Sequence, residues 1–546
     1  MPQTQDQMYG YEANFTWLQD AAQAKLPLIA YRLPESSTPN IEDWMFLNTS
    51  VKDVESSATP GILLQEFVAD QASVSSSPAS HSVVMPARTR GFEFRSHHPA
   101  PPSSVMSMSD DHASWNLDTL ARQMHSPDPV CRSLSDTPIR YSQKYLLDYF
   151  RRSIGPQCHL AHNDNPYVRL ILPIALSAPS GPLMQALLCA SANQLRLLSD
   201  RRFEKEAWMY RAKTLGLVRS ELDNFMTGLS RDTTSFEQLL ASVVMLCFVE
   251  ISNDAADTWM VHSACAQVLL SSDHRYSARS AELDDLCDFV HLYFAAHDAL
   301  ARTSWIDPRK QDWRLPVSDD HNHINGLTGC SKELLNLIMA TTNLANAISD
   351  AERHPREGSN RNAEHAFYDT GQRDGIERRL HQIEQWLPSK YLSQSESCPS
   401  PTSSLSPFSE PNRLHRLEII AEVKRLAALI YFYARIDRAT PEHPQIIRLT
   451  ASMLNLLRKV PVSANALLWP LYIVGTLGVQ SCQDEHRALV LERLEALEKR
   501  RQLRNVKDVR QVVVDVWKQR DLQTLSSREL CWSDIAICHG KRISLA

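Results

Sequence analysis

The sequence predicts an all-α protein. Apolar residues recur every three or four positions in several segments, and no convincing stretch alternates apolar with polar residues as a half-buried strand does. Glycine is scarce, at 15 of 546 residues, which argues against a turn-rich β-protein or a glycine-rich nucleotide fold. Hydrophobic residues make up 43% of the chain, enough for a sizeable core. We therefore expect one large domain of many helices packed as antiparallel pairs.

The N-terminal quarter of the chain differs from the rest in composition. Residues 1–138 hold 13 of the 30 prolines and many serines, and residues 1–130 carry 7 Lys and Arg against 15 Asp and Glu. A Pro/Ser-rich acidic segment buries too little apolar surface to offset the entropy of ordering it. We predict that residues 1–138 are mostly disordered and that residues 139–546 form the helical domain.

Two acidic-hydrophobic patches interrupt this N-terminal segment. One surrounds Trp44 and Phe46, and the other surrounds Leu63, Leu64 and Phe67. Patches of this kind can fold as short helices on a partner, so they are candidates for co-activator contact. Chance hydrophobic residues in a tail would look the same.

The first strong helical signals are apolar on nearly all sides. Residues 183–198 and 239–249 form such stretches, as expected of central helices surrounded by others. The second stretch is too short to span a bilayer and ends at Glu250.

The C-terminal part of the chain shows clear amphipathic periodicity. Residues 414–436 predict a helix that ends before Pro441, because the residue before a proline is pushed out of the α region. Two more helices are predicted near the C-terminus. The residues of these three apolar faces are Ile419, Val423, Leu426, Ile430 and Tyr433; Val490, Leu494 and Leu497; and Val506, Val509, Val513 and Val516. We expect Trp469 and Trp517, which lie in apolar helical contexts, to be core residues.

Two polar stretches interrupt the helical region. Residues 392–412 contain four prolines and many serines, which predicts a disordered insertion. The polar stretch 352–374 is a second candidate insertion. No fixed-period repeat is present, so a regular helical solenoid is not supported.

The chain lacks recognisable catalytic and cofactor motifs, including the nucleophile elbow, the zinc-protease helix and the phosphate-binding loops. His321 and His323 have no acidic or cysteine partner at a usable spacing, and Cys531 with Cys538 and His539 is an equally thin signal. Asp284 and Asp285 are adjacent, so on a helix they would point apart as solvated surface groups. We assign no catalytic, cofactor-binding or metal-binding residue and expect neither a cofactor nor an enzyme.

The cysteines favour a reducing compartment. There are 11, no two lie within four residues of each other, and many stand in apolar runs as buried free thiols would. The N-terminus lacks the charged-then-apolar pattern of a secretory leader. We expect an intracellular protein.

Basic residues gather once, between positions 499 and 510. The cluster consists of Lys499, Arg500, Arg501, Arg504, Lys507 and Arg510. It could serve nuclear import or contact phosphate. We favour a solvated face of two consecutive helices, because Glu492, Glu495 and Glu498 precede it at spacings that pair with these charges.

Several of these segments together resemble a known family. They are, in order, 165–177, 183–195, 245–251 followed by Trp259 and His262, 466–473, and then Arg487, 504–506 and 516–517. Over about residues 140–546 the chain resembles the fungal-specific transcription factor domain, the helical regulatory part of fungal binuclear zinc-cluster transcription factors. The resemblance implies a nuclear protein whose helical domain tunes activity and responds to metabolites or partners.

One feature of that family is missing from this sequence. Its zinc cluster needs six closely spaced cysteines among Lys and Arg, whereas the first cysteine here is Cys131 and the first 87 residues hold only Lys25, Arg32 and Lys52 as basic residues. We therefore assign no DNA-contacting residue. A reader module encoded upstream and action through another DNA-binding protein both stay open.

These observations predict a nuclear transcription regulator of a metabolic or secondary-metabolite gene cluster. The alternative is a helical scaffold, adaptor or co-regulator without DNA binding of its own. The expected partners are the transcription machinery or a DNA-binding co-regulator, with DNA contacted only indirectly or through a missing N-terminal module, and no membrane. A homodimer and a small-molecule effector are left open.

Overall fold

The computed structural model describes residues 141–161, 164–229, 232–253, 258–271, 280–305, 313, 315, 321–353, 361–389, 410–461, 465–523 and 543–546. The segment 1–138, both of its acidic-hydrophobic patches, and Cys531, Cys538 and His539 lie outside the described residues. So does most of the predicted insertion at 392–412, although the next helix already begins at Glu410.

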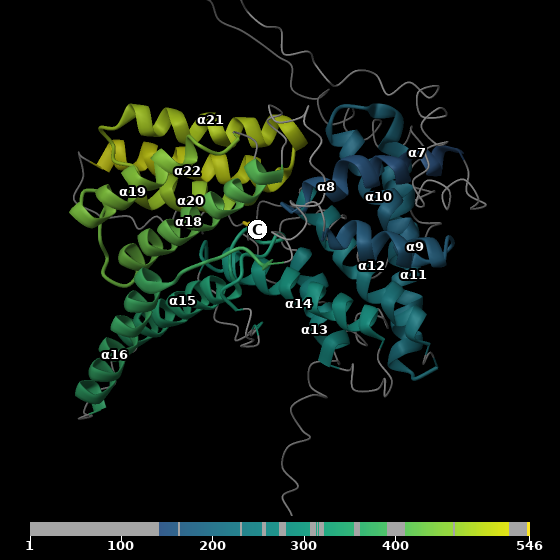
Figure 1. Cartoon of the computed structure of the whole chain (residues 1–546), viewed down its shortest axis with the longest axis horizontal. Helices are drawn as coiled ribbons and strands as arrows, with labels where there is room; N and C mark the ends of the chain where they lie inside the picture. The colour runs from purple at the N-terminus through teal and green to yellow at the C-terminus, as the bar shows by residue number, and fades with distance from the viewer. Residues whose placement is uncertain are drawn as a thin grey trace, which may run out of the picture. The chain divides into compact units, whose positions relative to one another are not determined.

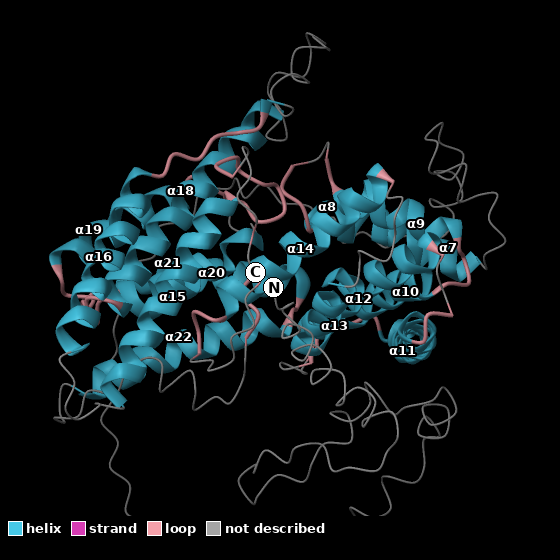
Figure 2. Ribbon diagram, turned by 90° about the horizontal axis from the view of Figure 1, so that it is seen from below, coloured by secondary structure: helices cyan, strands magenta, loops and turns pink. Residues whose placement is uncertain are grey.

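The all-α prediction is confirmed. The described residues form helices joined by loops, with isolated bridges but no strand among them (Figure 2). The N-terminal helices are α7 (Tyr141–Tyr149), η3 (Phe150–Ile154), α8 (Gly155–Gln157), η4 (Tyr167–Ile171), α9 (Leu172–Ser177), α10 (Pro182–Leu197), η5 (Arg201–Phe203), α11 (Glu204–Met226), α12 (Thr233–Ser252), α13 (Trp259–Ser271) and α14 (Ala281–Ala301). The later helices are α15 (Lys332–Arg353), α16 (Arg361–Gln382), α18 (Glu410–Arg435), α19 (Pro444–Leu457), η7 (Asn465–Leu467), α20 (Leu468–Ile473), η8 (Val474–Gly478), α21 (Asp484–Arg501) and α22 (Arg504–Gln523).

Helices α10 and α12 are central, as their all-round apolar sequences predict. Helix α10 packs against α7, α11 and α12, and α12 also packs against α13 and α14 (Figure 1). Helix α12 contacts α22 as well. Asp232 caps the start of α12 by accepting a hydrogen bond from the Ser235 backbone N–H at 3.1 Å. By length and composition α12 could cross a membrane, but 72% of that window is buried inside the protein, as in the core helix of a soluble protein.

Helix α18 is the equivalent centre of the C-terminal helices. It packs against α15, α16, α19 and α20, and α20 and α21 in turn pack against α22 (Figure 1). The periodic apolar residues predicted for α18, α21 and α22 are all buried, because each helix turns one face towards its neighbours. At Gly475 an added Cβ would come within 2.9 Å of the Val513 methyl groups, so glycine permits the close approach of η8 to α22.

The two predicted core tryptophans are buried and also hydrogen-bonded. Trp469 Nε1 donates to Thr303 Oγ1 at 3.0 Å, and Trp517 Nε1 donates to the Gly475 carbonyl at 2.7 Å. Each indole thus satisfies its one polar group inside the core.

The described parts of the polar stretch 352–374 are helical, and its interpretation as an insertion stays a prediction. Helix α15 continues to Arg353, and α16 starts at Arg361. Arg373 on α16 donates to both carboxylate oxygens of Asp437 at 2.8 and 2.6 Å and to Glu377 at 2.6 Å. The pair with Asp437 links α16 to the end of α18, and Ile376 and Leu380 of α16 are buried against its neighbours.

Residues 543–545 lie in the core, followed by the exposed Ala546. Ile543, Ser544 and Leu545 are buried, and both views place the C-terminal end between α14 and α20 (Figures 1 and 2). The Ser544 hydroxyl lies 2.8 Å from His297 Nδ1 on α14, and the Ser544 carbonyl accepts from Asn505 Nδ2 on α22 at 3.0 Å.

Candidate functional site

A cavity of about 130 Å³ lies among helices from both ends of the domain. Helices α12, α14, α18, α21 and α22 line it, together with the end of α8, residues 327 and 328, and residue 546. Its apolar lining includes Tyr167, Phe248 and Leu300, while its charged side chains are Lys424 and Arg501. No Asp or Glu side chain is among the described residues that line it.

Lys424 is a buried cation on α18, with 3% of its surface exposed. Its Nζ donates to the Thr328 carbonyl at 2.5 Å, and it makes no ion pair with any described residue. Burial lowers the pKa of Lys424, an effect opposed by the nearby Cys330 thiol. Among the described residues, a carbonyl dipole is thus the hydrogen-bond partner that compensates this ammonium group.

Arg501 is the second buried cation of the lining and the last residue of α21. It is 5% exposed, its Nε lies 3.4 Å from Gln194 Oε1, and its guanidinium stands over the Phe248 ring at 5.1 Å. Its Nη2 is buried without a hydrogen-bond partner among the described residues. In return, Gln194 Nε2 donates to the Arg501 carbonyl at 2.7 Å, which fixes the end of α21 against α10.

The other titratable side chains on the lining are uncharged at neutral pH, while Ala546, which also lines the cavity, carries the α-carboxylate of the chain end. Burial, and secondarily the nearby Lys424, lowers the pKa of His297 to about 3, so its imidazole is neutral. Burial raises the pKa of the Cys158 thiol, and it raises the pKa values of Tyr167 and Tyr293 well above their ordinary value. The side-chain charge on the cavity lining is therefore entirely positive.

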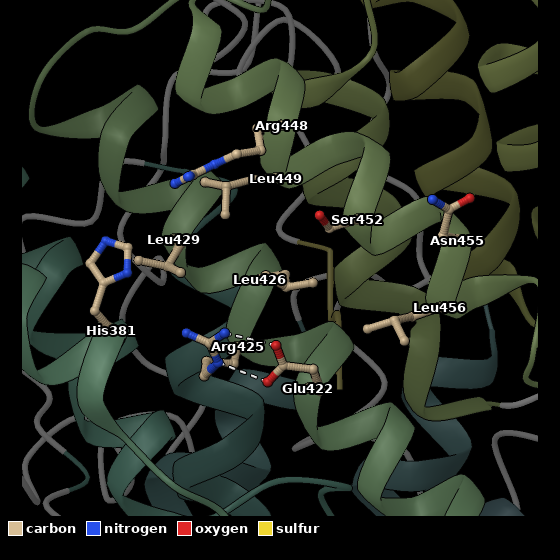
Figure 3. A pocket seen from close by; sticks show the side chains of 10 residues that line it. All are labelled: His381, Glu422, Arg425, Leu426, Leu429, Arg448, Leu449, Ser452, Asn455 and Leu456. Carbon is tan, nitrogen blue, oxygen red and sulfur yellow. Dashed lines mark hydrogen bonds and ion pairs between the residues drawn. The ribbon is translucent and has the colours of Figure 1, made fainter.

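A second hollow is a surface groove of about 490 Å³ between α18 and α19, with His381 of α16 at its edge. Figure 3 shows Leu426, Leu429 and Leu449 along the groove and Glu422 paired with Arg425. The pair is bidentate, with N–O distances of 2.7 and 2.8 Å. Unlike the cavity, the groove neutralises Arg425 with its own acid.

Most of the basic cluster at 499–510 is surface, as favoured from the sequence. Lys499 lies 3.8 Å from Glu495, and Arg510 pairs with Glu495 and Glu498 at 3.2 and 3.4 Å. Arg501 is the exception, because it points inward from the end of α21. The sequence-based assignment of Arg501 to a solvated face is therefore wrong.

The remaining candidates from the sequence are separate from the cavity. His323 lies beside Trp386, with ring centroids 6.2 Å apart, and Asp285 accepts from Arg169 at the surface at 2.8 Å. In the part of the chain that the structure describes, no group of three or more His, Cys, Asp or Glu residues is placed to hold a metal ion.

Residues 145–546 match the family described as the fungal specific transcription factor domain. The chain belongs to this family. The match covers nearly all of the described helical region, so the resemblance seen in the sequence is confirmed, and the cavity described above lies within the matched residues.

A curated relative of this fungal transcription factor domain protein is the trichothecene biosynthesis transcription regulator TRI10 of Trichoderma arundinaceum. The two chains are 25% identical over 126 residues, which is 23% of this chain and 29% of the relative. The aligned region thus spans less than a third of the relative's length. No solved structure matches the chain.

The cavity was not found from the sequence, although one signal was present. Lys424 interrupts an otherwise apolar face of α18 that includes Leu417, Ala421, Ala428 and Tyr431. A lone lysine in such a face is either a snorkelling side chain or a buried charge, and only the packing of neighbouring helices distinguishes the two.

Proposed function

We propose that the protein regulates transcription in the fungal nucleus and that its targets are the genes of a secondary-metabolite pathway. The match of residues 145–546 to the fungal specific transcription factor domain carries the proposal. The relative that is named as a regulator of trichothecene biosynthesis supports the choice of targets. In this role the helical domain contacts the transcription machinery or a DNA-binding co-regulator and takes a small-molecule effector in its cavity, and the protein is not an enzyme.

A co-regulator without DNA binding of its own is the second candidate. The basic cluster at 499–510 favours it, because Lys499 and Arg510 are paired with glutamates and Arg501 is buried. Such a cluster leaves few free cations to neutralise phosphates, which supply most of the affinity for DNA. Under this proposal the composition of residues 1–138 suits a disordered segment that contacts partners, as residues 392–412 suit a disordered insertion.

Three measurements in the source fungus test the function. A fluorescent fusion of the full chain should be nuclear, deletion of the gene should change the transcripts of one secondary-metabolite cluster, and chromatin immunoprecipitation should recover the promoters of that cluster. An unchanged transcriptome in the deletion strain would refute the proposal. Promoter occupancy that disappears when a second DNA-binding factor is deleted would support the co-regulator. Sequence-selective binding of duplex DNA by the purified chain alone would refute the co-regulator.

A further inference from the structure

We propose that the cavity between α12, α14, α18 and α21 binds a small organic anion, whose negative group is held by Lys424 and Arg501. Its apolar part would lie against Tyr167, Phe248 and Leu300. The binding is a property of the cavity itself. Only its regulatory meaning, that such an anion is the effector, rests on the proposed function.

The charge balance of the interior is the first observation behind this proposal. Where α11 and α12 bury Arg211, they also bury Glu250, with an N–O distance of 2.9 Å. Thr258 Oγ1 donates to the second oxygen of that carboxylate at 3.2 Å. Lys424 and Arg501 are equally buried and have no acid from the described residues. A buried charge without a counter-ion is costly, so an anion that enters the cavity gains an attraction that water no longer screens.

The unused donors of these two residues are the second observation. An ammonium group has three N–H donors, and Lys424 directs one of them to the Thr328 carbonyl. The guanidinium of Arg501 keeps Nη2 buried and without a partner among the described residues. A carboxylate accepts hydrogen bonds on both of its oxygens and has no hydrogen to donate, so it complements the unused donors of either residue.

The lining selects against a cation and against a fully hydrophilic ion. His297, Cys158 and the tyrosines Tyr167 and Tyr293 are uncharged, and no acidic side chain of the described residues reaches the cavity. Aromatic and leucine side chains make up much of the remaining wall. A ligand with one anionic end and an apolar body therefore satisfies both parts of the lining.

The volume of the cavity limits the size of the ligand. The volume of about 130 Å³ is close to that of an apolar protein cavity of roughly 150 Å³ that admits benzene. We therefore infer a small carboxylate or a similarly small anion, and exclude a ligand as large as a sterol or a nucleotide from the cavity in this conformation.

The C-terminal segment 543–546 covers part of the cavity. Ser544 is held by His297 and Asn505, both of which line the cavity, and Ala546 belongs to the lining. Two hydrogen bonds and the burial of Leu545 hold this short segment beside the cavity.

The test uses the purified full chain, with butyrate as the probe and butyramide as its uncharged isostere. With ionic strength held constant, saturating butyrate should raise the midpoint of thermal unfolding by about 2–4 °C, and butyramide should leave it unchanged, since only the anion is stabilised by the two cations. Inorganic phosphate should also have no effect, because it lacks an apolar part. An equal shift with butyramide or with phosphate, or no shift with butyrate, would overturn the proposal.

Three variants locate the site. Lys424→Met and Arg501→Met should each weaken butyrate binding at least about tenfold in isothermal titration, in line with the loss of a charge-assisted hydrogen bond. Arg493→Met is the matched control, since Arg493 is also buried and donates to a carbonyl, that of Val460 at 2.6 Å, but does not line the cavity. Unchanged binding in both cavity variants would refute the site. If one of them fails to fold, the comparison of butyrate with butyramide on the natural chain still decides.

The binding assay and the test of function can fail independently. Selective butyrate binding with an unchanged transcriptome in the deletion strain would leave the site intact and refute the proposed function. Absence of binding with a changed transcriptome would refute the site and leave the function.

Discussion

The groove and the cavity place adjacent residues of one helix in opposite electrostatic surroundings. On α18, Arg425 faces the surface groove and forms a bidentate pair with Glu422, while Lys424 points into the cavity and meets only a carbonyl. Both side chains carry the same charge. The groove provides an acid for a partly exposed cation, whereas no Asp or Glu side chain among the described residues lines the cavity beside the buried Lys424.

A third region shows that the domain can compensate a buried cation when structure alone requires it. Arg211 and Glu250 are 7% and 1% exposed and form a close ion pair between α11 and α12. Arg493, outside the cavity, is also buried and donates to a carbonyl, so what distinguishes the cavity is that two buried cations without an ion pair to a described residue line the same hollow. That is why we associate the cavity, rather than the groove, with ligand binding.

The largest effect is expected where a compensated buried pair is broken. Glu250→Gln should lower the free energy of unfolding by about 3–5 kcal/mol, because Arg211 would remain buried without its acid. Urea denaturation followed by circular dichroism measures the change. A decrease of less than about 1 kcal/mol in the free energy of unfolding would show that the interior tolerates an unpaired guanidinium at little cost. The Arg211–Glu250 pair would then no longer differ in energy from the unpaired cations of the cavity.

Acidification should destabilise the protein through its buried histidines. Burial lowers the pKa values of His297 and His262 from 6.5 to about 3, so between these values the unfolded chain takes up protons that the folded chain does not. The contribution of the two neutral histidines to the free energy of unfolding is complete above pH 6.5. It is lost as the pH falls towards 3, by up to about 1.4 kcal/mol per pH unit for each histidine. From pH 6.5 to 5 this amounts to about 2 kcal/mol per residue.

Denaturation curves at several pH values check this slope. His297→Asn keeps a side chain able to hydrogen-bond Ser544 but does not titrate. The free energy of unfolding of this variant should therefore fall less steeply with decreasing pH, by the contribution of one histidine. A slope equal to that of the natural chain would mean that His297 is protonated in the folded state.

A smaller effect is expected from Lys424→Met without ligand. The substitution removes a desolvated charge but leaves the Thr328 carbonyl unpaired, so the two effects nearly cancel and stability should stay within about 1 kcal/mol of the natural chain. Chemical denaturation in a buffer free of organic acids measures it. A loss of 3 kcal/mol or more would indicate that Lys424 has a structural partner and would weaken the contrast with Glu250→Gln.

The smallest effect is expected in the groove. Glu422→Gln should cost less than about 1 kcal/mol, because the pair with Arg425 is partly exposed to solvent and Arg425 keeps its bond to the Leu380 carbonyl at 3.0 Å. High salt should reduce the difference further. A salt-independent loss comparable to that of Glu250→Gln would show that the groove pair is as desolvated as the interior one.

The sequence by itself determined the fold class, the family and several helices. The apolar face from Ile419 to Tyr433 predicts α18, and the valines from Val506 to Val516 predict α22, because helical periodicity is a local property of the chain. The burial of Trp469 and Trp517 follows from the same local pattern.

Tertiary structure alone decided which charges are buried. Arg501 looked like a member of a surface cluster until its contact with Gln194, 307 positions earlier, fixed the end of α21 inside the domain. Arg373 of α16 pairs with Asp437, 64 positions later, and Ser544 meets His297, 247 positions earlier. Such contacts depend on how distant helices pack, and a local pattern of residue types does not encode the partner that a side chain will meet.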